Sequence, residues 1–491
     1  MISHISNPST IPLRHPDRIY VGGQWRVPSS ARLIEVTSPI TEQLVGAVAE
    51  ALDADIDMAV EAARDAFDSG PWPHMPAAER AEWLRKLAAG LQQRSVEFGH
   101  AWTNEVGTLF SLSAHVGEHA AYFSNYFADL AETFPFEEQL ASAIPNYAAT
   151  VIREPMGVAA AIVPWNGPLI LAIMKIAPAL VSGCTVVLKA SPEAPLDAYL
   201  LAEIAEDIGL PPGVLNVVAA HREASEHLVR HPGVDKVSFT GSTAAGKRIA
   251  SILGERMARY TMELGGKSAA IILEDMDVEQ AVSTLTNDLC LLSGQVCIAL
   301  TRVLIPRPKY NIFVDAFAAA MTKLRVGDPY DPESQLGPLS TATHRARVEN
   351  FIQAGRDQGA KLVVGGSRPQ HLPHGYYVAP TLFADVRNDM TIARDEIFGP
   401  VLSLIPVEDE DDAVRVANDS PYGLNASVLT SDSTRAYAIA RRIRTGNFGQ
   451  NGTHMDFTVG FGGVKSSGIG REGGLESLRS YTEAKTILLQ Q

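Results

Sequence analysis

The spacing of hydrophobic residues divides the chain into a mainly helical first part and a long region of alternating strands and helices. In the first part, Ala51 to Ala66 and Ala77 to Phe98 carry apolar residues at intervals of three and four, with charges between them. This spacing places the apolar side chains on one face and predicts a helix over each range. The pattern changes near Ala148, where short apolar runs begin.

From Gly157 onwards, short apolar runs alternate with helical ones, which is typical of βαβ units and a parallel sheet covered by helices. A second alternation begins near Ser268, so we expect two α/β domains in series. The expected elements are Gly157–Val163, Pro168–Val181, Thr185–Leu188, Leu196–Ile208, Val214–Val218, Glu223–Arg230 and Lys236–Thr240 in the first, and Ser268–Leu273, Arg302–Ile305, Tyr310–Leu324 and Val401–Leu404 in the second.

The last residues, Tyr481 to Leu489, alternate in polarity like a strand. No strand joined to it by a tight turn is evident, and a strand at a chain end can pair with another subunit. We therefore expect this segment to pair across a subunit interface.

Composition narrows the class of protein. A chain of 491 residues exceeds the size of one core, and its length suggests about three domains. The content of 46% apolar and 20% charged residues is typical of globular proteins and argues against extended disorder. Lys and Arg number 41 against 56 Asp and Glu, a net charge of −15, so we expect no binding to nucleic acid or to a membrane.

Cysteine content and the first residues bear on the compartment. Three cysteines cannot all pair within one chain, which favours a reducing compartment, the cytoplasm. Met1 to Tyr20 lacks the apolar core of a signal peptide. The most apolar stretch, Gly157 to Leu188, is interrupted by polar residues and prolines, so no piece of it is long enough to span a bilayer.

Two local patterns resemble known sites but fall short of them. Gly241 to Arg248 follows an expected strand as a P-loop does, yet Arg248 stands where Ser or Thr would hold magnesium. What remains is a glycine-rich turn whose backbone N–H groups suit a phosphate. His115 to His119 matches the H-x-x-E-H zinc-protease spacing. So short a pattern is common by chance and no further ligand cluster is evident, so we expect no metal.

Cys297 and Glu263 are candidates for nucleophilic and acid–base chemistry. Cys297 follows a polar, glycine-containing turn that could bring backbone N–H groups close to a substrate. Its alternative is an inert core thiol, the role we expect for Cys184 and Cys290. Glu263 stands between apolar neighbours, which would raise its pKa towards that of a general base. Its alternative is a carboxylate paired with Lys267.

Four further residues have two interpretations each. Asn166 could donate its amide to an oxyanion or merely fix a turn. Lys189, at the end of an expected strand, could reach ribose or phosphate oxygens or remain solvated. Glu396 and Phe398 could bind a ribose and pack on a ring, or simply belong to a turn.

Taken together, these motifs resemble the aldehyde dehydrogenase superfamily, in its hydrolytic, acid-forming branch, over nearly the whole chain. The resemblance rests on Pro164-Trp165-Asn166, Lys189 with Pro192-Glu193, Phe239-Thr240-Gly241-Ser242 with Gly246, Met262 to Lys267, Gly294 to Cys297, Glu396 to Pro400, Asn418 to Leu424 and Phe461 to Gly468. Several independent motifs in one order are far more specific than any one of them.

The resemblance implies a mechanism. Cys297 would attack the aldehyde carbon, and the Asn166 amide with the Cys297 N–H would hold the oxyanion. Hydride transfer to a nicotinamide would leave a thioester, which water activated by Glu263 would hydrolyse. By analogy with the family, Lys175 and Glu472 would relay the proton outward.

The resemblance also implies a fold and a cofactor. The fold is a Rossmann-type cofactor domain (residues 1–133 and 154–262), an α/β catalytic domain (263–473) and a small β oligomerisation arm (134–153 and 474–491) of a homodimer or homotetramer. The implied cofactor is NAD, bound by Pro164, Trp165, Lys189, Glu193, Gly241, Ser242, Gly246, Leu264, Glu396 and Phe398. NADP remains open, because the carboxylate that usually follows the cofactor lysine by three residues is Pro192 here, with Glu193 next.

The residues expected around the substrate are apolar. They are Leu171, Met174, Leu292, Val296, Ile298, Phe457 and Phe461. None could pair with a substrate carboxylate, and no aromatic cage for a quaternary ammonium is evident. The family's usual Phe-Asn pair before the cysteine turn is Leu291-Leu292 here. We therefore expect an aliphatic, terpenoid or aromatic aldehyde.

Three alternatives to this function stay open. A coenzyme A-dependent acyl-transferring relative would not need the Glu263 base. A catalytically retired structural or binding relative would usually have lost Cys297 or Glu263, and both are present. A thiol hydrolase acting on esters would leave Lys189 and Glu396 without a purpose.

Overall fold

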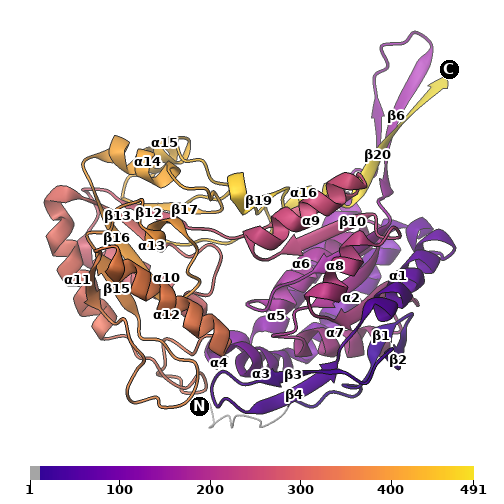
Figure 1. The fold of residues 1–491 in the computed structure, drawn as a ribbon. Coiled ribbons are helices and arrows are strands. Elements are labelled where there is room, and N and C mark those ends of the chain that lie inside the picture. Colours follow the sequence, from indigo (N-terminus) through magenta and orange to yellow (C-terminus); the bar gives the residue numbers. More distant parts are fainter. Residues whose placement is uncertain (1–10) are drawn as a thin grey trace.

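The computed structural model describes residues 11–491 as two α/β lobes and a projecting β arm (Figure 1). The prediction about Met1 to Tyr20 falls partly on residues 1–10, which lie outside the described residues. Over residues 11–491, none of the helices combines the length and apolar character needed to cross a membrane.

The first lobe is built on an eight-stranded sheet. In spatial order its strands are β19 (Gly468–Ile469), β11 (Arg259–Glu263), β10 (Lys236–Thr240), β7 (Val158–Ile162), β8 (Thr185–Ala190), β9 (Leu215–Ala219), β1 (Ile19–Val21) and β2 (Gln24–Arg26). The strands from β11 to β9 are parallel, whereas β19 and β1 run antiparallel to their neighbours. This parallel sheet confirms the first predicted alternation.

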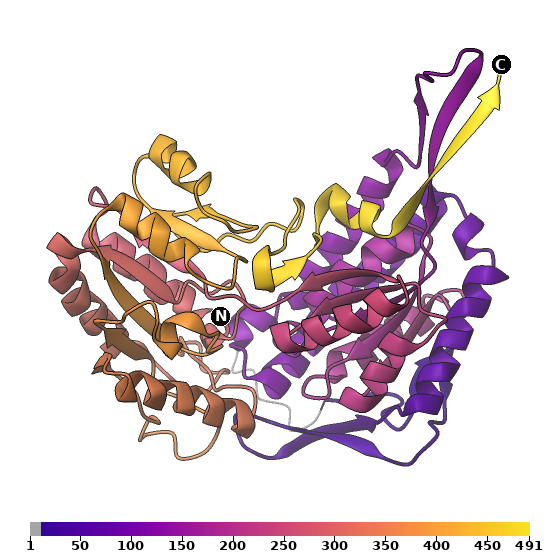
Figure 2. The same ribbon diagram turned by 45° about the horizontal axis from the view of Figure 1, so that its top comes forward.

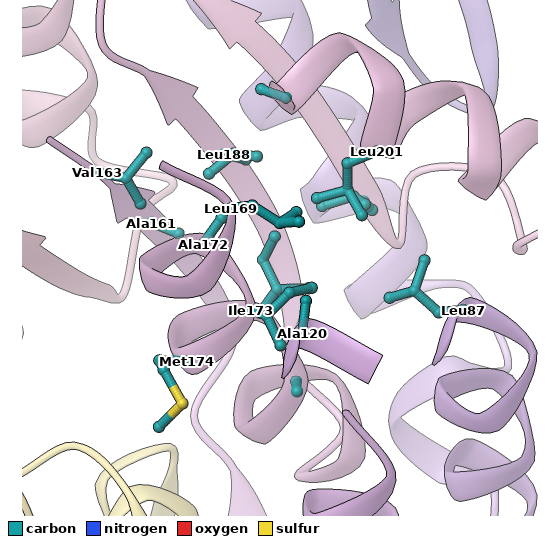
Figure 3. Packing of buried hydrophobic residues seen from close by; sticks show 14 of the residues in the cluster. Leu87, Ala120, Ala161, Val163, Leu169, Ala172, Ile173, Met174, Leu188 and Leu201 are labelled. Carbon is teal, nitrogen blue, oxygen red and sulfur yellow. The ribbon is translucent and has the colours of Figure 1, made fainter. Parts of the chain in front are cut away.

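Helices cover both faces of this sheet, which explains why β7 and β8 are buried along their whole length. One face packs on α6 (Pro168–Val181) and α7 (Leu196–Asp207), and the other on α1 (Asp53–Asp68), α8 (Arg222–Arg230) and α9 (Thr243–Glu255). Figure 3 shows Leu169 and Ala172 of α6 facing Leu188 of β8, while Met174 points away from that contact. The helix thus presents Met174 to a different part of the molecule.

The second lobe repeats this design. In spatial order its sheet contains β14 (Lys361–Val364), β15 (Thr381–Ala384), β16 (Val401–Val407), β13 (Arg302–Pro306), β12 (Ala269–Ile272), β17 (Ala426–Leu429) and β18 (Gly449–Gln450). All are parallel to their neighbours except β14. Its helices are α10 (Val278–Cys290), α11 (Tyr310–Thr322), α12 (Ala342–Asp357), α13 (Thr391–Arg394), α14 (Glu410–Asn418) and α15 (Ser433–Ala440), with short turns η3 (Arg307–Lys309) and η4 (Lys465–Ser467).

The first part of the chain differs from the prediction in two ways. The single helix expected over Ala77 to Phe98 is wrong: α2 (Ala77–Gln93) and α3 (Ser95–Val106) are separated at Arg94, whose φ of −100° and ψ of 17° leave helical geometry. The helical part also holds the hairpin β3 (Leu33–Thr37) and β4 (Leu44–Ala49), which the periodicity did not predict. The remaining elements before the arm are η1 (Trp72–His74), α4 (Phe110–Ser113) and α5 (Val116–Thr133).

The strand at the end of the chain finds a partner within its own chain. The arm is a three-stranded sheet of β20 (Thr482–Gln490), β6 (Tyr147–Pro155) and β5 (Glu137–Leu140), and it projects from the first lobe (Figure 2). β20 pairs antiparallel with β6 of the same chain over its full length, from Thr482 opposite Pro155 to Gln490 opposite Tyr147. The hydrophobic pattern did not indicate this pairing, because more than half of the chain separates the two strands. The resemblance, by contrast, had placed both segments in one arm. The short helix α16 (Gly474–Ser480) leads into β20.

Candidate active site

Three of the candidate catalytic residues line one cleft of about 480 Å³. Asn166 follows β7, Glu263 ends β11, and Cys297 follows the 3₁₀ turn η2 (Leu291–Gly294). A second cleft of about 450 Å³ shares Trp165, Gly241 and Ser242 with the first and adds Lys189. Both open at the carboxyl ends of parallel strands, the usual ligand edge of such sheets.

The turn before Cys297 has an unusual backbone. Leu292, Ser293 and Gly294 have φ values of 49°, 54° and 76°, three consecutive residues in the left-handed region. A Cβ added to Gly294 would lie 2.4 Å from the Gly399 carbonyl oxygen, so only glycine fits there. The predicted turn is present, and its strain is of the kind found at functional sites.

Cys297 is half-buried and faces the cleft. Burial raises the pKa of its thiol to about 12, and the Glu396 and Glu263 carboxylates add to this rise. The backbone N–H groups of Cys297 and Ile298 act in the opposite direction. These N–H groups therefore favour a negative charge at the sulfur.

Asn166 is held in place from two sides. Its side-chain amide donates to the backbone carbonyl of Gln295 at 3.0 Å, and its backbone carbonyl accepts from Trp102 Nε1 at 3.0 Å. Gln295 belongs to the turn that carries Cys297, so the amide lies beside that turn. The second N–H of the amide remains for another acceptor.

Glu263 is buried, with 4% of its surface exposed, and neither carboxyl oxygen has a hydrogen-bond partner among the described residues. Burial raises its pKa well above the usual value, and the nearby Glu472 adds to the effect. The alternative partner, Lys267, forms no such pair, since its Nζ also lacks a hydrogen-bond partner there. Glu263 thus has the environment of a general base.

Lys175 and Glu472 form a buried ion pair next to Glu263. Lys175 also donates to Thr240 Oγ1 at 2.7 Å, and Ser238 Oγ donates to Glu472 Oε1 at 2.8 Å. Thr240 lines the cleft, so this polar cluster reaches from the cleft into the interior of the first lobe.

The cofactor candidates line the two clefts. Lys189, the penultimate residue of β8, is buried, which lowers its pKa to about 8. Glu193 lines both clefts and accepts from Ser191 Oγ. Ser242 caps α9 by accepting from Ala245 N at 3.3 Å, so the first turn of this helix opens on the cleft.

Two glycines lie in close contact with side chains of the cleft. A Cβ on Gly246 would lie 2.5 Å from Leu264, which itself lines the cleft. A Cβ on Gly265 would lie 2.3 Å from Glu396 Oε2, while Glu396 Oε1 accepts from Gly266 N at 3.0 Å. Burial raises the pKa of Glu396 to about 7.

Sequence reasoning missed a group of cleft residues at the start of α12. They are Thr341, Thr343, His344 and Arg347. The His344 ring lies 5.4 Å from that of Trp165, and its Nε2 contacts the Phe398 carbonyl at 2.7 Å. Burial lowers the pKa of His344 to about 4, so the ring is neutral. Thr341 is a typical residue for a helix start, and its hydroxyl accepts from His344 N. Nothing in the sequence indicates that the start of this helix lies beside Trp165.

Of the residues expected around the substrate, Leu171 lines the cleft that holds Cys297. All seven belong to the large apolar core of the first lobe, against which Cys297 packs: Leu171, Met174, Leu292, Val296, Ile298, Phe457 and Phe461. The ring of Phe457 lies 5.2 Å from that of Phe461 and 5.5 Å from that of Phe123, which the sequence did not indicate. Tyr126, on the same helix as Phe123, donates to the Thr458 carbonyl at 2.7 Å and holds the segment beside Phe457.

Arg248 of the P-loop-like turn lines the second cleft, whereas the H-x-x-E-H segment lies away from both clefts. Arg248 pairs with Glu226 at 2.8 Å, and His115 contacts Glu118 at 3.2 Å on the surface. Over residues 11–491 there is no group of three or more His, Cys, Asp or Glu side chains placed to hold a metal ion.

Comparison with known proteins places this site in a family. The aldehyde dehydrogenase family model matches residues 25–487. Geranial dehydrogenase from Castellaniella defragrans is 45% identical over 96% of this chain and 98% of its own length.

Two solved structures resemble the whole fold. An aldehyde dehydrogenase of Mycobacterium tuberculosis in complex with NAD+ is 44% identical, with a TM-score of 0.94 over 97% of this chain and 99% of that one. A cysteine-to-alanine variant of aldehyde dehydrogenase C from Pseudomonas syringae, in complex with NAD+ and octanal, is 38% identical, with a TM-score of 0.94 over 98% of each chain. The α/β fold and the resemblance seen in the motifs are confirmed: the chain belongs to the aldehyde dehydrogenase family.

Proposed function

We propose that the protein oxidises an apolar aldehyde to the carboxylic acid with NAD as the oxidant. The observation that carries this proposal is the convergence of Cys297, Asn166 and an unpartnered, buried Glu263 on one cleft that continues to Lys189. Solved relatives with NAD+ bound support the choice of cofactor.

The residues present fit a dinucleotide. The capped start of α9 offers N–H groups to a pyrophosphate, and Lys189 and Glu193 offer polar groups to a ribose. At the other end, Glu396 and the rings of Trp165 and Phe398 would hold the second ribose and the nicotinamide. When bound, NAD supplies the acceptor for the hydride that leaves the substrate.

Cys297 acts first, as the nucleophile. Its sulfur attacks the aldehyde carbon, the C=O bond opens, and the Asn166 amide with the Cys297 N–H stabilises the oxyanion. Loss of hydride then gives a thioester on Cys297. Because the thiol pKa is raised to about 12, only a small fraction is thiolate at neutral pH, and this step is expected to speed up as the pH rises.

Glu263 acts second, as the base for hydrolysis. It takes a proton from a water whose oxygen bonds to the thioester carbon, and the carbon–sulfur bond breaks to release the acid and Cys297. Glu472 and Lys175, which lie next to Glu263, are the groups that would take the proton onward.

The proposed substrate class rests on the seven apolar residues expected around the substrate, of which Leu171 lines the cleft that holds Cys297. None of the seven carries a charge, and Phe457 and Phe461 add aromatic surface. A similar protein named for geranial supports a terpenoid, and one solved with octanal supports an aliphatic chain. We therefore propose a medium-length aliphatic, terpenoid or aromatic aldehyde.

We also propose the domain organisation implied by the resemblance. Residues 1–133 and 154–262 would bind the cofactor, 263–473 would carry catalysis, and 134–153 with 474–491 would form the arm of a homodimer or homotetramer. Apolar side chains exposed on the arm support its role in assembly: Leu140 is 54%, Leu488 45% and Leu489 63% exposed.

A panel of aldehydes tests the proposed substrate class. With NAD, hexanal, citral and benzaldehyde are expected to reduce the cofactor with higher kcat/KM than succinic semialdehyde or betaine aldehyde, because a charged group would be desolvated without a partner. Absorbance of the reduced cofactor gives the rates, and NADP in parallel settles the preference left open by Pro192. Faster turnover of either charged aldehyde would contradict the class. A rate that rises with coenzyme A would favour acyl transfer instead.

Gly265→Ala tests the fit around Glu396. The added methyl group would overlap Glu396 Oε2, so the carboxylate must move and the affinity for NAD is expected to fall about 10-fold. A matched control is Gly254→Ala in α9, where nothing lies within 4 Å of the added carbon. This control is expected to keep the affinity for NAD and to gain up to about 1 kcal/mol of stability. Titration with NAD measures the affinity, and thermal unfolding measures the stability of each variant. Equal NAD affinity for the two variants would exclude the role of Glu396.

A further inference from the structure

A charged pair bridges two helices at the second cleft, the one that holds Lys189. Glu226 on α8 and Arg248 on α9 both line this cleft, and their side chains form an ion pair at 2.8 Å. The two helices pack against each other, so the pair joins them beside the cleft. The mechanism proposed above gives neither residue a role.

The same two helices supply an apolar wall to the second cleft. It consists of Val229, Ile249 and Ile252, which are all buried. Val229 lies three residues after Glu226 on α8. Ile252 lies four residues after Arg248 on α9. Residues at these spacings share one face of a helix, so the charged pair and the apolar wall belong to one surface.

The groups already assigned in the two clefts leave this surface for the adenine of the cofactor. Cys297 lies in the first cleft, where the nicotinamide must lie to take the hydride. Ser242 at the start of α9 lines both clefts, which suits the pyrophosphate between the two halves. The adenosine half therefore extends into the second cleft with Lys189, where a flat base can pack on the apolar wall.

Glu226 keeps one oxygen that can accept a further hydrogen bond. Its Oε1 accepts from Arg248 Nη2 at 2.8 Å, from Arg230 Nε at 2.9 Å and from Arg230 Nη2 at 2.8 Å. Among the described residues, its Oε2 accepts only from Arg248 Nε, at 3.3 Å. The side chain is 30% exposed, so the carboxylate is open to the cleft.

The ionisation state of Glu226 restricts what it can bind. Hydrogen bonds from Arg248 and Arg230 lower its pKa to about 2, so it is a carboxylate at neutral pH and can only accept. Adenine carries an amino group, a donor, at the edge of its ring. Hypoxanthine carries an oxygen at the same position, and its lone pairs would face the carboxylate.

We propose that Glu226 selects the base of the cofactor: its Oε2 accepts a hydrogen bond from the amino group of adenine, while the ring packs on the apolar wall. Arg248 holds the carboxylate in place from α9. The proposal rests on the use of NAD proposed above, and it concerns binding alone, since no bond of the cofactor is made or broken at this end.

Two dinucleotides of equal charge test this assignment. NAD and nicotinamide hypoxanthine dinucleotide differ only in the base, so any general attraction of the cleft for anions affects both equally. Isothermal titration gives the two dissociation constants without turnover. We expect the unaltered protein to bind NAD about 10-fold more tightly, because a site that accepts from an N–H group rejects the analogue that lacks it.

Two variants remove the proposed contact. Glu226→Ala has no acceptor, and Glu226→Gln offers either an acceptor or a donor, so we expect each to bind the two dinucleotides within about 2-fold of each other. The matched control is Glu223→Gln. Glu223 is an exposed carboxylate one turn earlier on α8 that does not line the cleft, and its variant should keep the preference of about 10-fold.

A preference for NAD that persists in Glu226→Ala would overturn the proposal, because Glu226 would then only neutralise Arg230 and Arg248. Equal binding of the two dinucleotides by the unaltered protein would overturn it as well, and this comparison needs no variant to fold. The unaltered protein also separates the two levels of the argument. If it binds no NAD, the proposed function fails, whereas tight binding without preference concerns Glu226 alone.

Discussion

Replacing Cys297 with alanine is expected to abolish aldehyde oxidation, with a loss of about 10⁴-fold or more in kcat/KM. The sulfur is the atom that binds the aldehyde carbon in the proposed mechanism, and no other cysteine lines the cleft. The thiol is half-buried, and its replacement leaves the turn of Leu292 to Gln295 intact, so the fold should persist. Formation of reduced cofactor with hexanal measures the loss, and thermal unfolding checks the fold.

Cys290→Ala is the matched control for this experiment. Cys290 ends α10 only seven residues before Cys297, and burial raises the pKa of its thiol to about 11, so both thiols are protonated at neutral pH. It does not line the cleft, and its removal should leave kcat/KM unchanged. Equal activity of the two variants would exclude Cys297 as the nucleophile and reopen a binding role without catalysis.

The fold was largely predictable because its buried strands have a strong local signature. The all-apolar runs of β7 and β8 follow from helices on both faces, and the predicted bounds of α6 and β10 coincide with the structure. Long-range pairing has no such signature. The partner of β20 is β6, and no local pattern identifies this pair; the two segments were grouped in one arm only through the family resemblance.

The candidate site was predictable where chemistry and sequence motif coincide. Asn166 lies shortly after a predicted strand and Cys297 follows the predicted glycine-containing turn, whereas Glu263 ends β11, a strand that was not predicted. The fold brings the three residues to one cleft. His344 and Phe123 were missed for a different reason. Each lies on an amphipathic helix with no local sign of function, and each matters only because the fold places it beside Trp165 or Phe457.

Glu263→Gln is expected to separate oxidation from hydrolysis. Glutamine keeps the shape of the side chain but cannot take a proton from water, so the steady state should slow by about 10³-fold while one reduced cofactor per site still forms at first. The fall of kcat at the acid end of the pH profile reports the protonation of Glu263. Because burial raises the pKa of Glu263 well above its usual value, activity should fall on acidification well before an exposed glutamate would titrate, and the variant should not show this fall.

The Glu263→Gln variant is expected to lose activity without losing stability against unfolding. The pKa of Glu263 is higher in the folded than in the unfolded chain, so ionisation of this carboxyl group costs folding free energy as the pH rises through the folded value. Neutral glutamine removes that cost, and the variant should unfold at an equal or higher temperature above neutral pH. A slow enzyme that is no less stable points to lost chemistry. If the first turnover disappeared together with the steady state, Glu263 would instead act on the Cys297 thiol, and its assignment to the hydrolytic water would be wrong.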